Sequence, residues 1–135
     1  MASFPLKIVT PDGLIYEGQA EKVIVRTKEG DMAVLARHIN CVCPLGMGEA
    51  VVEIDGKRRT AACIGGLLNV INGSVSLVPN TFEWADEIDV ARAENAKARA
   101  EATLKKPDLS EREIRIAQAR LNRALVRISV ANNIK

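Results

Sequence analysis

A chain of 135 residues, 47% hydrophobic and 27% charged, has the composition of a folded protein with one domain, or one domain plus an appendage. The net charge of +2 requires no polyanionic partner, and no apolar run reaches the length of a membrane span. The start, MASFPLKIVT, lacks the basic and apolar regions of a signal peptide, so we expect a protein that works in the cytosol.

Residues 1–84 carry the pattern of an all-β fold. Short runs rich in Val and Ile alternate with turn signals, and they read LKIVT, LIYEG, KVIVRT, MAVL, VVEI, TAACI, LLNVI and VSLV. Asp55-Gly56 and Asn72-Gly73 accept positive φ at both central positions of a tight hairpin, so each pair should join antiparallel neighbours. Gly65-Gly66 is expected where the backbone turns tightly or approaches another surface. Roughly eight to ten strands in this length predict an antiparallel β sandwich or a flattened barrel.

The first predicted helix lies within EIDVARAENAKARAEATL, residues 87–104. Alanine has the highest helix propensity but offers little apolar area, so this segment should form a stable helix that holds its neighbours weakly. Asp86 is its expected N-cap, with Glu87 and Asp89 in the opening turn, where the helix dipole favours acids.

The second predicted helix begins at a capping box made by Ser110 and Glu113, after Pro107 has ended the first helix. The connecting loop is short, so the two helices should form an antiparallel hairpin. An apolar stripe is predicted along the second helix, and arginines on the face beside it. The stripe comprises Ile114, Ala117, Leu121, Ala124, Leu125 and Ile128, and the arginines are Arg112, Arg120, Arg123 and Arg127. Because the hairpin buries only a narrow seam, it should detach without unfolding the β part.

Residues with reactive side chains form no recognisable catalytic or metal-binding pattern. Cys41, Cys43 and Cys63 make an odd number without disulfide-framework or zinc spacing, which favours reduced, buried thiols. His38 is the single histidine and has no serine or cysteine with an acid beside it, which favours a loop or core role. We therefore predict no catalytic residue, no metal site and no enzyme activity.

Three stretches, GDMAVLARHINCVCPLGMGEA, GGLLNV and EIDVARAENAKARAEATL, resemble in this order the epsilon subunit of bacterial F-type ATP synthases, the counterpart of the mitochondrial delta subunit. The resemblance spans essentially the whole chain. It departs from the family at Ala36-Arg37, where Pro-Gly is usual, and at Asn40, where proline is common.

The resemblance implies a sandwich of about ten strands over residues 1–84, which binds the gamma subunit and the c ring, and a regulatory helical hairpin over residues 85–135. It implies a non-catalytic central-stalk subunit of the proton-translocating synthase, which couples rotation to catalysis. Such a subunit is peripheral on the cytoplasmic face of the cell membrane and does not insert into it. When the hairpin extends, it is expected to contact the catalytic alpha and beta subunits and to inhibit ATP hydrolysis.

The resemblance also implies a regulatory ATP ligand and no further cofactor. Some bacterial epsilon subunits bind ATP through a motif of Ile or Leu, then Asp, two free positions, Arg and Ala, and Ile88–Ala93 matches every fixed position. The predicted ATP-binding residues are Glu83, Ile88, Asp89, Arg92, Ala93, Arg99, Arg123 and Arg127.

The residue spacing is consistent with such a site. Asp89, Arg92, Ala96 and Arg99 follow one another at intervals of three, four and three, so they should lie on one helical face. An acid accepts hydrogen bonds from an adenine amino group or ribose hydroxyls, and arginines hold phosphates. The alternative is a capped helix with solvated surface charges.

A second alternative is a small nucleic-acid- or nucleotide-binding module with an arginine-rich helix. Against nucleic acid as a partner, the strands lack interleaved aromatic residues that could stack on bases.

Overall fold

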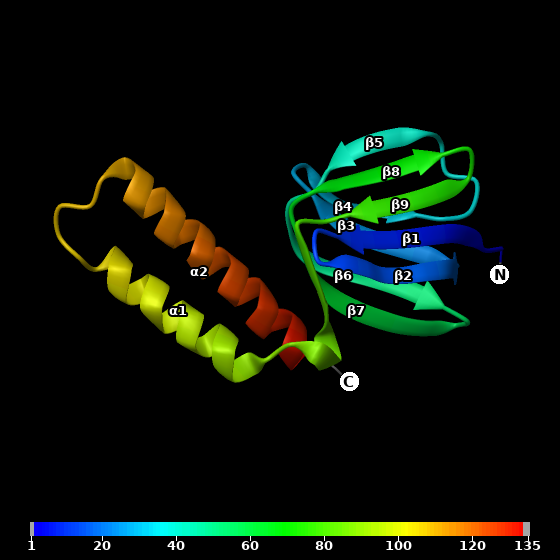
Figure 1. Cartoon of the computed structure of the whole chain (residues 1–135). Helices are drawn as coiled ribbons and strands as arrows, with labels where there is room; N and C mark the ends of the chain where they lie inside the picture. Colours follow the sequence, from blue (N-terminus) through cyan, green and yellow to red (C-terminus); the bar gives the residue numbers. More distant parts are fainter. Residues whose placement is uncertain (1, 134–135) are drawn as a thin grey trace. The chain divides into compact units, whose positions relative to one another are not determined.

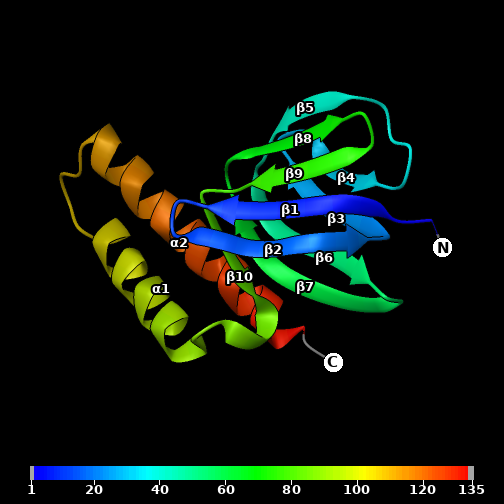
Figure 2. The same cartoon turned by 45° about the vertical axis from the view of Figure 1, so that its right-hand side comes forward.

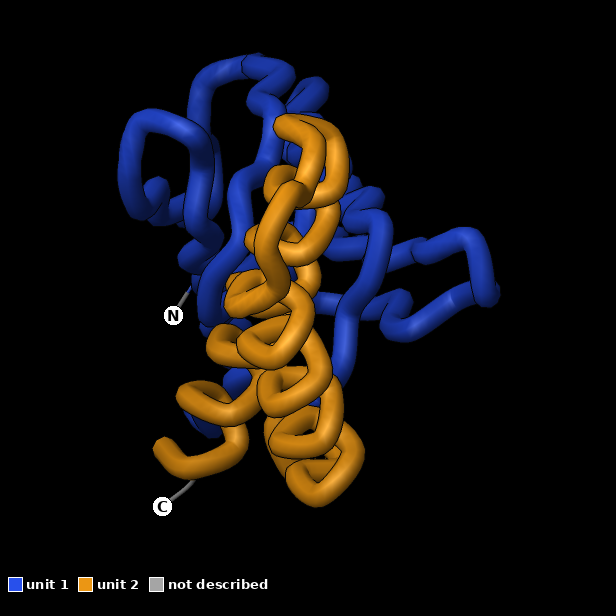
Figure 3. Tube along the Cα trace, turned by 90° about the vertical axis from the view of Figure 1, so that its left-hand side faces the viewer, with its two compact units in different colours: residues 1–84 blue, residues 85–135 orange. Residues whose placement is uncertain are grey.

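The structure is a computed structural model that describes residues 2–133. The chain divides into two compact units, residues 1–84 and residues 85–135 (Figure 3). Within the described residues, the first unit contains ten strands and the second contains a 3₁₀ helix and two α-helices (Figure 1). The strands are β1 Phe4–Thr10, β2 Gly13–Ala20, β3 Lys22–Thr27, β4 Gly30–Val34, β5 Cys41–Pro44, β6 Met47–Ile54, β7 Lys57–Ile64, β8 Leu67–Ile71, β9 Ser74–Val78 and β10 Thr81–Trp84. The helices are η1 Ala85–Glu87, α1 Val90–Leu104 and α2 Glu111–Asn132.

The ten strands form two five-stranded sheets, which confirms the predicted sandwich. One sheet has the order β2-β1-β9-β8-β5 and the other β10-β7-β6-β3-β4 (Figures 1 and 2). Asp55-Gly56, with φ of 52° and 74°, joins β6 to β7, and Asn72-Gly73, with φ of 49° and 84°, joins β8 to β9. Both hairpins are therefore as predicted. One pairing departs from the antiparallel rule, because β1 runs parallel to β9.

The core of the first unit lies between the sheets, where strand alternation places apolar side chains inward. In β1, Phe4, Leu6 and Ile8 are buried while Pro5 and Lys7 are exposed. Each fully buried side chain of this size contributes about 1.5–3 kcal/mol to folding.

Trp84 closes the unit at its last strand. Its ring meets that of Phe82 edge-on, with centroids 5.0 Å apart, and the Arg59 guanidinium lies 3.8 Å from its centroid. Trp84 is the single tryptophan of the chain, so its fluorescence reports on the folding of this unit.

Two strands, β5 and β10, were not predicted. Each has four residues, CVCP and TFEW, which is too short for alternation to stand out from a loop. The expectation of three buried thiols was right for Cys63 but wrong for Cys41 and Cys43, which are half-buried on the edge strand β5. Burial raises the pKa of Cys63 to about 12, and burial, followed by the Cys43 thiol, raises the pKa of Cys41.

Gly65 and Gly66 lie at the tight turn between β7 and β8, as expected. Their φ angles are +66° and +93°, in the region that favours glycine. A Cβ on Gly65 would overlap the Asn80 side-chain amide, and a Cβ on Gly66 would overlap the Val78 carbonyl oxygen. Both a positive φ and a close backbone approach therefore require glycine here.

The N-cap of α1 is Asp89, so the assignment of Asp86 was wrong. Asp89 Oδ1 accepts a hydrogen bond from the Arg92 backbone N–H at 3.0 Å. Asp86 instead lies in the 3₁₀ helix η1, after which the buried Ile88 donates its N–H to the Ala85 carbonyl. Because the 3₁₀ turn comes first, α1 begins at Val90, later in the chain than a cap at Asp86 would give.

The capping box of α2 is confirmed. The Glu113 backbone N–H donates to Ser110 Oγ, and the Ser110 backbone N–H donates to Glu113 Oε1, both at 3.1 Å. The hydrogen bond from the Ser110 backbone N–H, followed by the Ser110 side chain, lowers the pKa of the Glu113 carboxyl. The carboxylate therefore stays ionised at the positive end of the α2 dipole.

The two helices run antiparallel (Figure 1) and meet through alanines, and those of α2 belong to the predicted stripe. Ala93 and Ala100 on α1 and Ala117 and Ala124 on α2 are buried, and each pair is separated by seven residues, as in a heptad repeat. By contrast, Ile114 and Leu125 are 43% and 42% exposed, so their assignment to the buried stripe was wrong. Alanines let the two backbones approach closely, which leaves the larger side chains at the margins of the seam.

Candidate nucleotide-binding groove

An open groove of about 630 Å³ lies between α1 and α2, within the second unit. Buried alanines, Ala100 on α1 and Ala117 on α2, form its floor, because longer side chains there would fill it. The groove is lined by Ala96, Arg99, Ala100, Thr103, Glu113, Ile116, Ala117, Arg120, Arg123 and Arg127.

Arginines dominate the walls of this groove. Arg99 comes from α1, while Arg120, Arg123 and Arg127 come from α2, and Glu113 is the one acid among the lining residues. Four guanidinium groups against one carboxylate, which is already engaged by Ser110, make the groove attractive to a polyanion. The helical hairpin therefore brings together three predicted residues, Arg99, Arg123 and Arg127.

Arg120 was not among the predicted binding residues. It precedes Arg123 by three residues and Arg127 by seven, so helical periodicity places it on their side of α2. That spacing was the signal available in the sequence.

Asp89, the predicted acid at the start of α1, lies in a second depression, which adjoins the groove through Arg99. This depression, of about 610 Å³, is lined by Asp89, Ala91, Arg92, Asn95, Ala98 and Arg99. Asp89 and Arg92 do not line the groove between the helices, and Arg99 is the residue common to both sites. Asn95, whose side-chain amide can donate and accept hydrogen bonds, was also missed.

Three other predicted residues line neither depression. Ile88 and Ala93 are buried, so the side chains at these two positions of the motif are not open to a ligand. Glu83 lies on β10 in the first unit and is half-buried.

Within residues 2–133, no group of three or more His, Cys, Asp and Glu side chains is arranged to hold a metal ion. His38 lies in the loop before β5, where its Nδ1 is 2.9 Å from the Ile39 carbonyl oxygen. No helix among the described residues is long and apolar enough to cross a membrane.

The first unit exposes an apolar surface on the outer side of strands β5, β8 and β9. Val42, Leu67, Ile71 and Val78 form this outer apolar face, and Val42 is 61% exposed. Leu67 pairs with Val78 across the two strands, so these two side chains are neighbours. Asn69 lies between Leu67 and Ile71 on β8, and its Oδ1 is buried and has no hydrogen-bond partner within the described residues. Contiguous apolar surfaces of this kind mark sites of protein association.

A β sandwich with an apolar outer face, followed by an arginine-lined helical hairpin, defines a binding subunit of a larger assembly. Family models agree with this class. Residues 3–85 match the β-sandwich domain of the ATP synthase delta/epsilon chain, and residues 86–132 match its long α-helix domain. The chain is 42% identical over 133 residues to the ATP synthase epsilon chain of Ruminococcus albus and 38% identical to that of Shouchella clausii, with 98% of each chain covered in both cases.

Solved structures show the same likeness. A chain of the mitochondrial ATP synthase of Euglena gracilis, in a structure of OSCP, F1 and the c-ring, matches with a TM-score of 0.83 and 26% identity over 98% of this chain and 83% of that one. A chain from the central stalk and c-ring structure of the Tetrahymena thermophila mitochondrial enzyme matches with a TM-score of 0.67 and 10% identity over 94% and 95%, which shows the fold alone.

The chain therefore belongs to the delta/epsilon chain family of ATP synthase and is a non-catalytic stalk subunit. This confirms the resemblance found in the sequence. It also sets aside the nucleic-acid-binding module as the main interpretation.

Proposed function

We propose that this rotor subunit restrains ATP hydrolysis by the synthase through its helical hairpin, and that ATP bound to the compact hairpin relieves the restraint. The observation that carries this proposal is the convergence of four arginines from both helices on one alanine-floored groove. A ligand in that groove contacts α1 and α2 together, so it holds the hairpin closed.

The groove suits a triphosphate. Guanidinium groups bind phosphate oxygens through paired, charge-assisted hydrogen bonds, each worth about 1.5–3 kcal/mol. Arg123 and Arg127 are half-buried, which reduces the screening of their charges by solvent. We therefore place the phosphates against Arg99, Arg123 and Arg127, with Arg120 at the margin.

The nucleoside would occupy the adjoining depression, because Arg99 lines both sites. Asp89 Oδ1 caps α1, and we propose that the second carboxylate oxygen accepts a hydrogen bond from an adenine amino group or a ribose hydroxyl. Asn95 offers a further donor and acceptor on the same side of α1. In this arrangement Ile88 and Ala93 act through packing and not through contact with ATP.

The energetics allow a switch. At an ATP concentration ten times Kd, binding stabilises the compact hairpin by about 1.4 kcal/mol, which shifts a balanced equilibrium about tenfold. When ATP falls, the alanine seam releases and α2 becomes free to present its arginines to the catalytic alpha and beta subunits. The hairpin would then block hydrolysis.

Replacing Arg123 and Arg127 together with glutamine should weaken ATP binding by at least about 100-fold, because two charge-assisted hydrogen-bonding groups are lost. Isothermal titration calorimetry on the purified chain measures this directly. The matched control is Arg112→Gln with Arg115→Gln, which removes the same charge from exposed positions outside the groove. If both double variants lost the same ATP affinity, the loss would come from the change in net charge, and the groove would not be the ATP site.

The role of Asp89 needs a variant that keeps the cap. Alanine at this position would remove the N-cap and destabilise α1 by about 0.5–2 kcal/mol. Asp89→Asn preserves the capping acceptor and removes the charge. We expect unchanged helicity with weaker ATP binding, and undiminished affinity would exclude Asp89 from the site.

We further propose that the gamma subunit covers the outer apolar face of Val42, Leu67, Ile71 and Val78, and that the first unit also contacts the c ring. Burial of these side chains would give the association energy. Attachment to the c ring would hold the subunit peripherally at the cytoplasmic face of the membrane of a proton-translocating synthase.

Removing residues 85–135 should leave assembly intact and raise ATP hydrolysis by the assembled complex. If the extended, inhibitory hairpin is present half of the time, its removal roughly doubles the active fraction. Steady-state ATPase activity and co-purification of the shortened chain with the gamma subunit are the measurements. Trp84 fluorescence provides the folding control for residues 1–84. A complex that assembles but hydrolyses ATP more slowly would contradict the inhibitory role.

A further inference from the structure

Three sulfur atoms gather at one edge of the β sandwich. Cys41 and Cys43 lie on β5, the edge strand of the first sheet, and Met32 lies on β4, the edge strand of the second (Figure 2). Because Cys41 and Cys43 are two residues apart in a strand, both side chains face the same side, opposite the exposed Val42. Cys43 Sγ lies 3.7 Å from Met32 Sδ, and all three residues pack against the margin of the core.

A histidine adjoins the cluster. His38 Nδ1 lies 4.0 Å from Cys41 Sγ, in the loop that leads into β5. Four soft or borderline ligands thus come from residues 32–43, and the fold brings the two strands that carry the sulfurs together.

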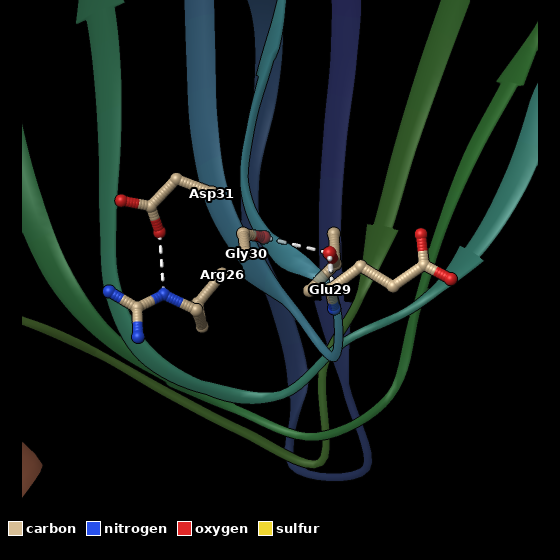
Figure 4. Close-up of polar contacts among 5 residues, drawn as sticks. Arg26, Glu29, Gly30 and Asp31 are labelled. Atoms are coloured by element: carbon tan, nitrogen blue, oxygen red, sulfur yellow. Dashed lines mark hydrogen bonds and ion pairs between the residues drawn. The ribbon is translucent and has the colours of Figure 1, made fainter.

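Two of the three sulfur residues, Met32 and Cys43, face a cavity. A cavity of about 550 Å³ is lined by Cys43 and Met32 together with Val42, Pro44 and residues 27–31 of the β3–β4 hairpin. Figure 4 shows how this hairpin is fixed: Asp31 turns toward Arg26 and accepts its Nε–H at 2.6 Å, while Thr27 Oγ1 donates to the Gly30 carbonyl at 2.7 Å. The Asp31 carboxylate is therefore engaged by Arg26, and the soft donors that line the cavity are the sulfurs of Cys43 and Met32.

The donor set selects the type of metal. Structural zinc takes four nitrogen, sulfur or carboxylate ligands in a tetrahedron, and no group of three such side chains is so arranged in residues 2–133. Thiolate and thioether sulfurs select Cu(I). A cluster whose donors are mainly sulfur atoms suits a soft cation better than any hard cation.

We propose that Cys41, Cys43 and Met32 form a binding site for a soft monovalent cation, Cu(I), at the open edge of the sandwich. Binding replaces the two thiol protons, which pass to solvent, and forms two Cu–S(thiolate) bonds and one Cu–S(thioether) bond without any change of oxidation state. The metal links β4 to β5 and so ties the edges of the two sheets together.

The test is a competition experiment on the reduced full-length chain under anaerobic conditions. Cu(I), supplied as its acetonitrile complex, is titrated against the chromophoric chelator bathocuproine disulfonate. We expect one Cu(I) per monomeric chain, and no comparable binding of Zn(II) in a parallel titration. Trp84 fluorescence should show that the loaded chain unfolds at a higher temperature, because the ion binds the folded state.

Matched variants locate the site. Cys41→Ser with Cys43→Ser should abolish binding, whereas Cys63→Ser, which removes the buried thiol on β7, should leave it unchanged. Met32→Leu, which keeps a similar side-chain volume, should weaken Cu(I) binding about tenfold or more. Loss of a group that only supports a metal ligand already costs about tenfold in metal affinity, and Met32 is proposed as a ligand itself. Circular dichroism on each variant separates loss of the ligand from loss of the fold.

Several outcomes would overturn the assignment. They are Cu(I) binding that survives in the Cys41→Ser/Cys43→Ser variant, binding that depends on Cys63, Zn(II) binding of equal strength, and a metal-bridged dimer in place of a loaded monomer. Unchanged affinity in Met32→Leu would remove the thioether from the site and with it the proposed link between β4 and β5.

Discussion

Gly66→Ala should destabilise the first unit by about 3 kcal/mol or more. Alanine at a φ of +93° costs about 1–3 kcal/mol in backbone strain, and its Cβ would also overlap the Val78 carbonyl oxygen and lie 2.5 Å from Pro79 Cα. These contacts are with backbone atoms, so the β9–β10 connection must shift to relieve them. A unit of this size then loses at least about 12 °C in Tm, followed through Trp84 fluorescence.

Gly73→Ala is the matched control. Gly73 has a φ of +84°, close to that of Gly66, but a Cβ there would meet nothing within 4 Å. This variant should lose only the strain of the positive φ, about 1–2 kcal/mol. If the two variants melted at the same temperature, the close approach of Val78 and Pro79 would have no part in the requirement for glycine.

Ala124→Leu should open the helical hairpin. Ala124 is buried in the seam between α1 and α2, where a larger side chain overpacks the contact and costs about 1–3 kcal/mol. Pairing of the helices then weakens by about 5- to 150-fold. Hydrogen exchange read by mass spectrometry should show the amides of α1 exchanging faster by a comparable factor, and ATP affinity should fall with the population of the closed state.

The control for this variant is Ala102→Leu. This variant introduces the same side chain at an exposed position of α1 outside both depressions, so the free energy of pairing between the helices should change by no more than about 0.5 kcal/mol. Unchanged exchange rates in Ala124→Leu would show that the seam is loose enough to accept a leucine. The alanine contacts would then not set the strength of the closed state.

Local patterns in the sequence determined much of the fold. The Asp-Gly and Asn-Gly pairs each place two positive φ angles in succession, a requirement that few other residues meet, so both hairpins were predictable. Ser110 and Glu113 satisfy each other's backbone groups within one turn, so the start of α2 was equally local. The family resemblance indicated Arg99, Arg123 and Arg127, and these three residues line the groove between the helices.

Tertiary structure decided the features that depend on which surfaces meet. The parallel pairing of β1 with β9 joins strands far apart in sequence, and no local signal encodes such a partner. Ile114 and Leu125 had the greater hydrophobicity, yet Ala117 and Ala124 fill the seam, because close approach of the two backbones leaves space only for methyl groups. The sulfurs of Met32 and Cys43 meet for the same reason: each lies on a strand that ends its own sheet, and only the stacking of the two sheets brings those edges together.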